Sequence, residues 1–253
     1  MSLEGFDLGI LGPAFLAGLL VLSTHVPLGQ EVLARGIIFI DLAIAQIAGL
    51  GVIAAHSFGW EAHGWEVQIA AISAALSGAL ILNWTEQRWP DIQEALIGVL
   101  FVLAASAGIL FLSNNPHGGE HLKELLVGQI IWTNLANLVP LAVLYSVVLG
   151  LWFGLRAHLG RPGFYLLFAV SVTASVQLVG IYLVFATLII PAIATRGIQH
   201  EWPRLFTGYG VGIAGYGVGL VLSALLDLPT GAVIVLSLAV IGSLVAFINK
   251  PVG

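Results

Sequence analysis

The chain has 253 residues, of which 59% are hydrophobic and only 8% are charged. Soluble domains carry about 25% charged residues, so this composition excludes an ordinary water-soluble enzyme and a disordered chain. The net charge of −5 without a basic cluster argues against nucleic acid as a partner. The absence of cysteine excludes disulfides, thiol nucleophiles and cysteine-zinc sites.

Long apolar stretches along the chain predict membrane-spanning helices of about 20 residues each. They are too continuous for the alternating strands of an outer-membrane barrel. The stretches lie at residues 8–27, 33–56, 65–84, 92–113, 134–155, 164–195, 205–226 and 229–248. The residues before the first stretch lack the basic region of a secretory signal, so we expect this span to remain in the mature protein.

The stretch 164–195 is uncharged and too long for one straight span, and Gln177-Leu-Val-Gly180 near its middle offers a bend. The positive-inside rule favours two crossings here, because with the N-terminus outside only Lys123 then lies outside. The basic residues that fall in the cytoplasm are Arg35, Arg88, Arg156, Arg161, Arg196, Arg204 and Lys250. We therefore expect an all-α bundle of about nine spans, forming one transmembrane domain over residues 1–253, with a cytoplasmic C-terminus.

Asp41 is the most informative polar residue, because an ionisable side chain inside a span costs about 2.5–3.5 kcal/mol on insertion scales. Such a group usually faces the bundle interior and marks a transport pathway; the alternative is a structural role. His25 and Asp41 are expected at similar depths on antiparallel spans, which makes His25 a candidate partner. Gln46 lies about 140° around the helix from Asp41, so these two do not form one tight ligand pair. Glu94 is expected at the inner membrane face, satisfied by Arg88.

An outer loop carries His117-Gly-Gly-Glu120-His121, which matches a zinc-protease pattern. That chemistry needs a helix and a further ligand, whereas two glycines and Asn114-Asn-Pro116 indicate a loop. A plain solvated loop is the leading interpretation. Weak metal collection by His117 and His121 is the alternative, and an intramembrane metalloprotease using both with Glu120 is retained only for exclusion.

Glycines also recur at helical spacing between residues 205 and 226. They are Gly208, Gly212, Gly215 and Gly219, on one helix face, and this spacing predicts close helix packing. Gly210-Val-Gly212-Ile-Ala-Gly215 matches a dinucleotide-binding pattern, but it lies inside a predicted span rather than after a strand. We therefore predict helix packing and no dinucleotide site.

Three stretches resemble the membrane-spanning permease subunits of zinc and manganese ABC importers. Residues 94–101 (EALIGVLF) resemble an acidic-x-x-Ile-Gly run, and residues 179–195 (VGIYLVFATLIIPAIAT) resemble the family's Val-Gly to Ile-Ile-Pro-Ala segment. Residues 226–232 (LDLPTGA) resemble the start of its last helix. Their order and spacing also fit, so the resemblance covers most of the chain.

The resemblance implies one half of an importer in the bacterial inner membrane. Two permease chains form the pathway, cytoplasmic ABC ATPases drive it, and an external binding protein delivers the metal. The chain itself is then not an enzyme and holds no tightly bound cofactor, since the divalent metal is its transported substrate.

Two departures from the family pattern bear on this expectation. The family typically carries Asp-x-x-x-His in its second helix, but Ala45 stands four residues after Asp41; in the other register Gln46 replaces the histidine and Leu42 the aspartate. The cytoplasmic stretch before residue 164, where the family has a coupling helix, is short.

We therefore predict a zinc or manganese permease with Asp41, His25 and Gln46 along its pathway. The alternative is a permease-like protein without an ATPase, acting as a passive carrier or a structural subunit.

Overall fold

The computed structural model describes residues 8–57, 65–112 and 126–249, and these residues form helices and short connections without a strand. The chain divides into two compact units. We call residues 1–35, 126–149 and 178–253 the terminal unit, and residues 36–125 and 150–177 the central unit. The expected single domain stays a prediction, and each unit is described by itself.

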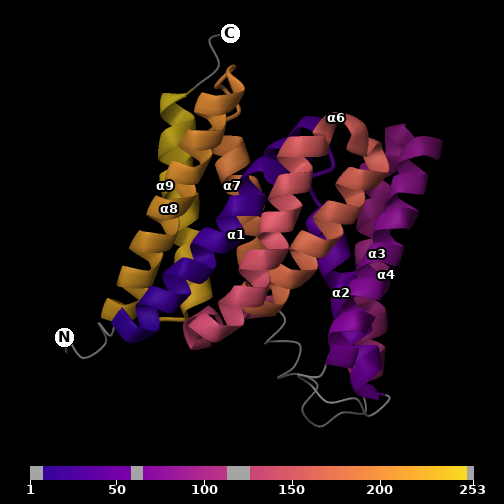
Figure 1. Cartoon of the computed structure of the whole chain (residues 1–253), viewed down its shortest axis with the longest axis horizontal. Helices are drawn as coiled ribbons and strands as arrows, with labels where there is room; N and C mark the ends of the chain where they lie inside the picture. The colour runs from indigo at the N-terminus through magenta and orange to yellow at the C-terminus, as the bar shows by residue number, and fades with distance from the viewer. Residues whose placement is uncertain (1–7, 58–64, 113–125, 250–253) are drawn as a thin grey trace. The chain divides into compact units, whose positions relative to one another are not determined.

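The terminal unit contains α1 (Leu8–Arg35), the short η3 (Ile130–Trp132), α7 (Ile181–Ala194), α8 (Glu201–Leu226) and α9 (Thr230–Ile248). α1 packs against α7 and α8, and α9 packs against the same two helices. Figure 1 shows α8 and α9 running alongside each other. Among the described residues of this unit, α1, α7, α8 and α9 therefore pack into one core.

The glycine face of α8 explains this packing. A Cβ on Gly208 would lie 2.8 Å from a methyl of Val26 in α1, and one on Gly219 would lie 2.6 Å from the Cα of Ile234 in α9. Gly212 and Gly215 face Leu22 and Leu238 in the same way. The predicted packing role of these glycines is confirmed, because they let α1 and α9 approach closely.

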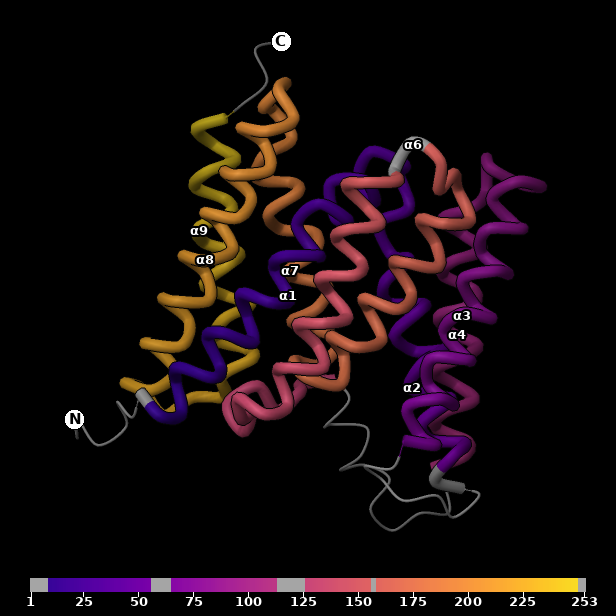
Figure 2. The backbone as a smooth tube through the Cα atoms, viewed as in Figure 1, coloured from indigo at the N-terminus to yellow at the C-terminus, as the bar shows by residue number. Residues whose placement is uncertain are grey.

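The central unit contains α2 (Ile40–Ser57), α3 (Trp65–Arg88), the short η2 (Pro90–Ile92) and α4 (Gln93–Leu112). α2 packs against both α3 and α4. Part of α6 (Leu135–Val179) also belongs to this unit. α6 is interrupted at Gly160, whose φ of 56° and ψ of −163° are not helical, and Figure 2 shows the backbone reversing direction within α6. Trp152 and Phe164 pack on either side of the reversal, with ring centroids 6.0 Å apart.

The described residues contain the predicted apolar helices in the predicted order. Seven helical segments are long and apolar enough to cross a membrane, and two shorter apolar helices, α2 and α7, complete the set. The bend predicted at residues 177–180 is confirmed, because α6 ends at Val179 and α7 begins at Ile181. α7 has 14 residues. It is therefore about 21 Å long, shorter than the ~30 Å hydrocarbon core.

Two neighbouring predicted boundaries are wrong: the first helix continues to Arg35 instead of ending near residue 27, and the second begins at Ile40 instead of residue 33. Pro27 lies inside α1. Its ring lacks an N–H, so the carbonyl of Ser23, four residues earlier, loses its helical donor. The hydroxyl of Tyr209 in α8 donates to this carbonyl at 2.9 Å. The helix continues past the proline because a neighbouring helix satisfies the freed group.

Tyr209→Phe is therefore expected to lower the free energy of unfolding by about 1–3 kcal/mol, because the Ser23 carbonyl is left without a donor. Thermal unfolding in detergent measures this effect. Tyr182→Phe is the matched control, because that side chain is 55% exposed on α7. Equal stability of the two variants would show that the hydrogen bond does not support α1.

Candidate functional site

Asp41 is the second residue of α2, and its side chain is only 1% exposed. Neither carboxylate oxygen has a hydrogen-bond partner among the described residues. Buried polar atoms in proteins are nearly always hydrogen-bonded, and an unpaired acidic group in apolar surroundings is costly. Such a group is consistent with a binding site for a cation, as the sequence predicts.

The chain enters α2 through a short turn. Ile40 N–H donates to the Ile37 carbonyl at 3.2 Å, and the first helical bond of α2 runs from Ala43 N–H to the Phe39 carbonyl at 3.2 Å. Phe39 is therefore the N-cap residue, and Asp41 lies in the first turn of the helix. A carboxylate in the first turn also meets the positive end of the helix dipole.

Glu94 lies beside this turn, in the first turn of α4. Its Oε1 accepts a hydrogen bond from Phe39 N–H at 3.1 Å. The prediction that Arg88 pairs with Glu94 is wrong. The ion pair found among the described residues joins Arg35 to Glu31, with 2.8 Å between Nε and Oε1. Glu94 reaches the start of α2 because α2 and α4 pack against each other in the central unit.

His25 lies in α1, is fully buried, and has a defined ring orientation. Its Nδ1 lies 3.0 Å from the Val21 carbonyl oxygen and 3.0 Å from the Thr24 hydroxyl. A carbonyl only accepts, so Nδ1 carries the proton and Nε2 presents a lone pair. Nε2 has no partner in the part of the chain that the structure describes. The imidazole is therefore set up as the kind of neutral nitrogen ligand that a transition metal uses.

The remaining candidate residues are not brought into one cluster. His25 belongs to the terminal unit and Asp41 to the central unit, so their pairing stays a prediction. Gln46 is half-buried on α2, one and a half turns beyond Asp41, and its role also stays a prediction. His117 and His121 lie outside the described residues. No group of three metal-ligating side chains occurs within the described ranges.

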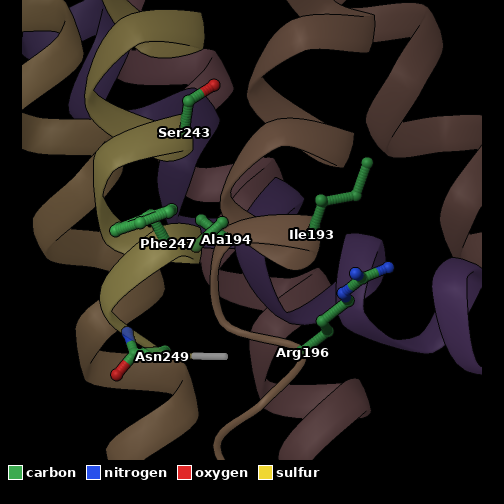
Figure 3. A pocket seen from close by; sticks show the side chains of 7 residues that line it. Ile193, Ala194, Arg196, Ser243, Phe247 and Asn249 are labelled. Atoms are coloured by element: carbon green, nitrogen blue, oxygen red, sulfur yellow. The ribbon is translucent and has the colours of Figure 1, made fainter. Parts of the chain in front are cut away.

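A cavity of about 320 Å³ lies in the terminal unit, at the C-terminal ends of α7 and α9. Its lining residues are Ile193, Ala194, Arg196, Ser243, Ala246, Phe247 and Asn249. Figure 3 shows Arg196 on the α7 side and Ser243, Phe247 and Asn249 on the α9 side. None of the predicted metal ligands lines this cavity, and its charged group is a cation. It therefore does not suit a divalent metal ion.

Comparisons with known proteins match nearly the whole chain. Residues 7–161 and 152–249 match the model of a family described as the ABC 3 transport family. A probable metal transport system membrane protein of Chlamydia muridarum is 21% identical over 248 residues, covering 88% of this chain and 83% of the relative. The manganese transport system membrane protein MntC of Halalkalibacterium halodurans is 24% identical over 246 residues, covering 89% and 82%.

A solved structure has a similar fold. PsaBC from Streptococcus pneumoniae, in complex with Fab, matches with a TM-score of 0.76 and 21% sequence identity. The match covers 98% of this chain and 94% of that chain. At this level of identity the likeness is evidence for the fold, and the all-α membrane bundle predicted from the sequence is confirmed.

Proposed function

The chain belongs to the ABC 3 transport family, and from this premise we propose that it carries a divalent metal ion, zinc or manganese, across the bacterial inner membrane. It is a membrane permease of a metal transport system and not an enzyme in itself. In this proposal, two permease chains form the pathway, cytoplasmic ABC ATPases power it, and an external binding protein supplies the metal.

The observation that carries the proposal is the buried carboxylate of Asp41, whose two oxygens have no partner among the described residues. An unpaired ionisable group inside a membrane protein usually marks a substrate or ion pathway. Carboxylate oxygens suit manganese and imidazole nitrogen suits zinc, so Asp41 is a candidate ligand for the first ion and the buried, unpartnered Nε2 of His25 for the second. Gln46 adds a neutral oxygen on the same helix.

The chemistry of these residues supports transient binding. A tight site for zinc usually has four protein ligands, and three when catalytic. The described residues contain no group of three. A transported ion must leave its site as readily as it enters, so a sparse set of ligands favours passage over storage. His117 and His121 are proposed only as an outer-loop collecting pair.

Two linked measurements test this proposal. The tagged protein, purified gently from its native host, is expected to bring a stoichiometric ABC ATPase with it. Proteoliposomes of this complex, supplied with the external binding protein and ATP, are then expected to accumulate zinc or manganese, and iron(II) is tested in parallel. An unrelated tagged membrane protein from the same host is the control for both steps.

Reproducible absence of an ATPase, together with metal movement that does not need ATP, would contradict this proposal. That result would favour the passive carrier instead. The observation behind this second candidate is the short connection at residues 155–162, where α6 is interrupted at Gly160. ATP-dependent uptake would show that this short connection still couples to the ATPase.

A further inference from the structure

α2 begins without a capping group of its own. Phe39 occupies the N-cap position, where serine, threonine, aspartate or asparagine usually accepts a hydrogen bond from the first turn. In a capping box, a glutamate or glutamine three residues later reaches back to the N-cap N–H. Here that position is Leu42, which has no acceptor. The N–H of Phe39 therefore needs an acceptor from elsewhere in the molecule.

Glu94 supplies this acceptor from another helix. Its Oε1 accepts the Phe39 N–H at 3.1 Å, although the two residues are 55 positions apart. Glu94 also lies in the first turn of α4. One carboxylate therefore lies at the N-terminal ends of two helices, where a negative charge is favourable. A neighbouring helix therefore supplies the glutamate that, in a capping box, would come from α2 itself.

The beginning of α4 is itself firmly held. The side-chain amide of Gln93 donates to the Leu82 carbonyl of α3 at 2.9 Å and to the Tyr165 hydroxyl of α6 at 3.3 Å. Gln93 is only 4% exposed. Since Gln93 precedes Glu94 directly, these bonds fix the backbone that carries the capping carboxylate.

Asp41 depends on this arrangement because it lies two residues after Phe39. No hydrogen bond to its carboxylate oxygens is found among the described residues, so the start of α2 sets where the carboxylate lies. We propose that Glu94 is a positioning residue for transport: by capping α2 from α4 it holds Asp41 where the passing metal meets it. This inference rests on the proposed function, since it takes Asp41 as the group that contacts the metal.

The test compares Glu94→Ala, which removes the acceptor, with Glu94→Gln, which keeps an oxygen for the Phe39 N–H. Glu66→Ala is the matched control, because Glu66 is the second residue of α3 as Glu94 is of α4. Amide hydrogen exchange at residues 39–43 reports on the cap, and the KM and maximal rate of zinc and manganese uptake report on transport. All variants are measured in the full-length chain with its ATPase.

Glu94→Ala is expected to speed exchange at the start of α2 roughly fivefold, as loss of a helix cap does. It is also expected to raise KM on the order of tenfold, the effect typical of losing a group that orients a metal ligand. Glu94→Gln is expected to restore both values to near those of the unchanged protein. Glu66→Ala is expected to change neither.

Three results would overturn the positioning role. The first is unchanged hydrogen exchange in Glu94→Ala. The second is faster exchange in Glu94→Ala with an unchanged KM. The third is normal exchange in Glu94→Gln with a raised KM. The last would mean that Glu94 meets the metal through its own charge. A lack of uptake by the unchanged protein would instead overturn the proposed function, and the transport role of Glu94 with it, while the exchange data would still report on the cap.

Discussion

Asp41→Asn is expected to reduce metal uptake at least tenfold while leaving the amount of protein in the membrane unchanged. Asparagine has nearly the same shape but no charge, so the site loses its anionic ligand for a divalent cation. The magnitude follows from the 10–100-fold losses seen when even an outer partner of a metal ligand is removed. Uptake of radioactive zinc and manganese, corrected for the amount of permease in the membrane, measures the effect.

The stability of this variant separates a functional role from a structural one. Both oxygens of Asp41 lack partners among the described residues, so the substitution breaks no hydrogen bond there. It also removes the need to bury an ionisable group, which is unfavourable when the group is unpaired. The variant is therefore expected to be at least as stable as the unchanged protein, as is common when a functional residue is replaced.

Asp227→Asn is the matched control for this experiment. Asp227 is exposed at the end of α8 and adopts a left-handed conformation with φ of 52°. Asparagine tolerates this conformation well, so the same substitution is expected to change neither stability nor uptake there. Normal uptake by Asp41→Asn would remove Asp41 from the pathway, and loss of the protein from the membrane would indicate a structural role instead.

The helices could be predicted from the sequence because membrane spanning is a local property. A stretch of about 20 apolar residues crosses the bilayer whatever its neighbours are. The bend at residues 177–180 was also predictable, because glycine there permits a conformation that other residues avoid. The glycine face of α8 followed from spacing on one helix. These signals all lie within one short segment.

The partners of the polar groups could not be predicted in the same way. Glu94 bonds a backbone amide 55 residues away, and Tyr209 bonds a carbonyl 186 residues away. Each contact depends on which helices pack together and at what depth, which hydrophobic length does not determine. Two local signals existed in hindsight: Pro27 frees the Ser23 carbonyl, and α2 lacks its own cap. Both indicate that an acceptor or donor is needed, but neither identifies which residue supplies it.

Gly180→Ala is expected to lower the free energy of unfolding by about 3 kcal/mol or more, because two effects combine. Gly180 separates α6 from α7 with φ of 80° and ψ of 163°, a region that essentially only glycine occupies. A Cβ there would also collide with the backbone of Val127 and Gly128. Gly128, with φ of 70°, would collide in turn with the backbone of Val179 and Gly180. Both collisions are with backbone atoms, which cannot rotate away as a side chain could.

Thermal unfolding in detergent measures this loss, with Gly154→Ala as the control. Gly154 is in α6, and a Cβ there would meet nothing within 4 Å. Alanine in a helix interior is favoured over glycine by roughly 0.5–1 kcal/mol, so the control is expected to be slightly more stable than the unchanged protein. If Gly180→Ala is as stable as Gly154→Ala, the junction of α6 and α7 does not need the glycine conformation. Glycine-to-alanine is thus expected to lower the free energy of unfolding at residue 180 and to raise it slightly at residue 154. This difference tests the backbone geometry of the junction, whether or not the protein transports a metal.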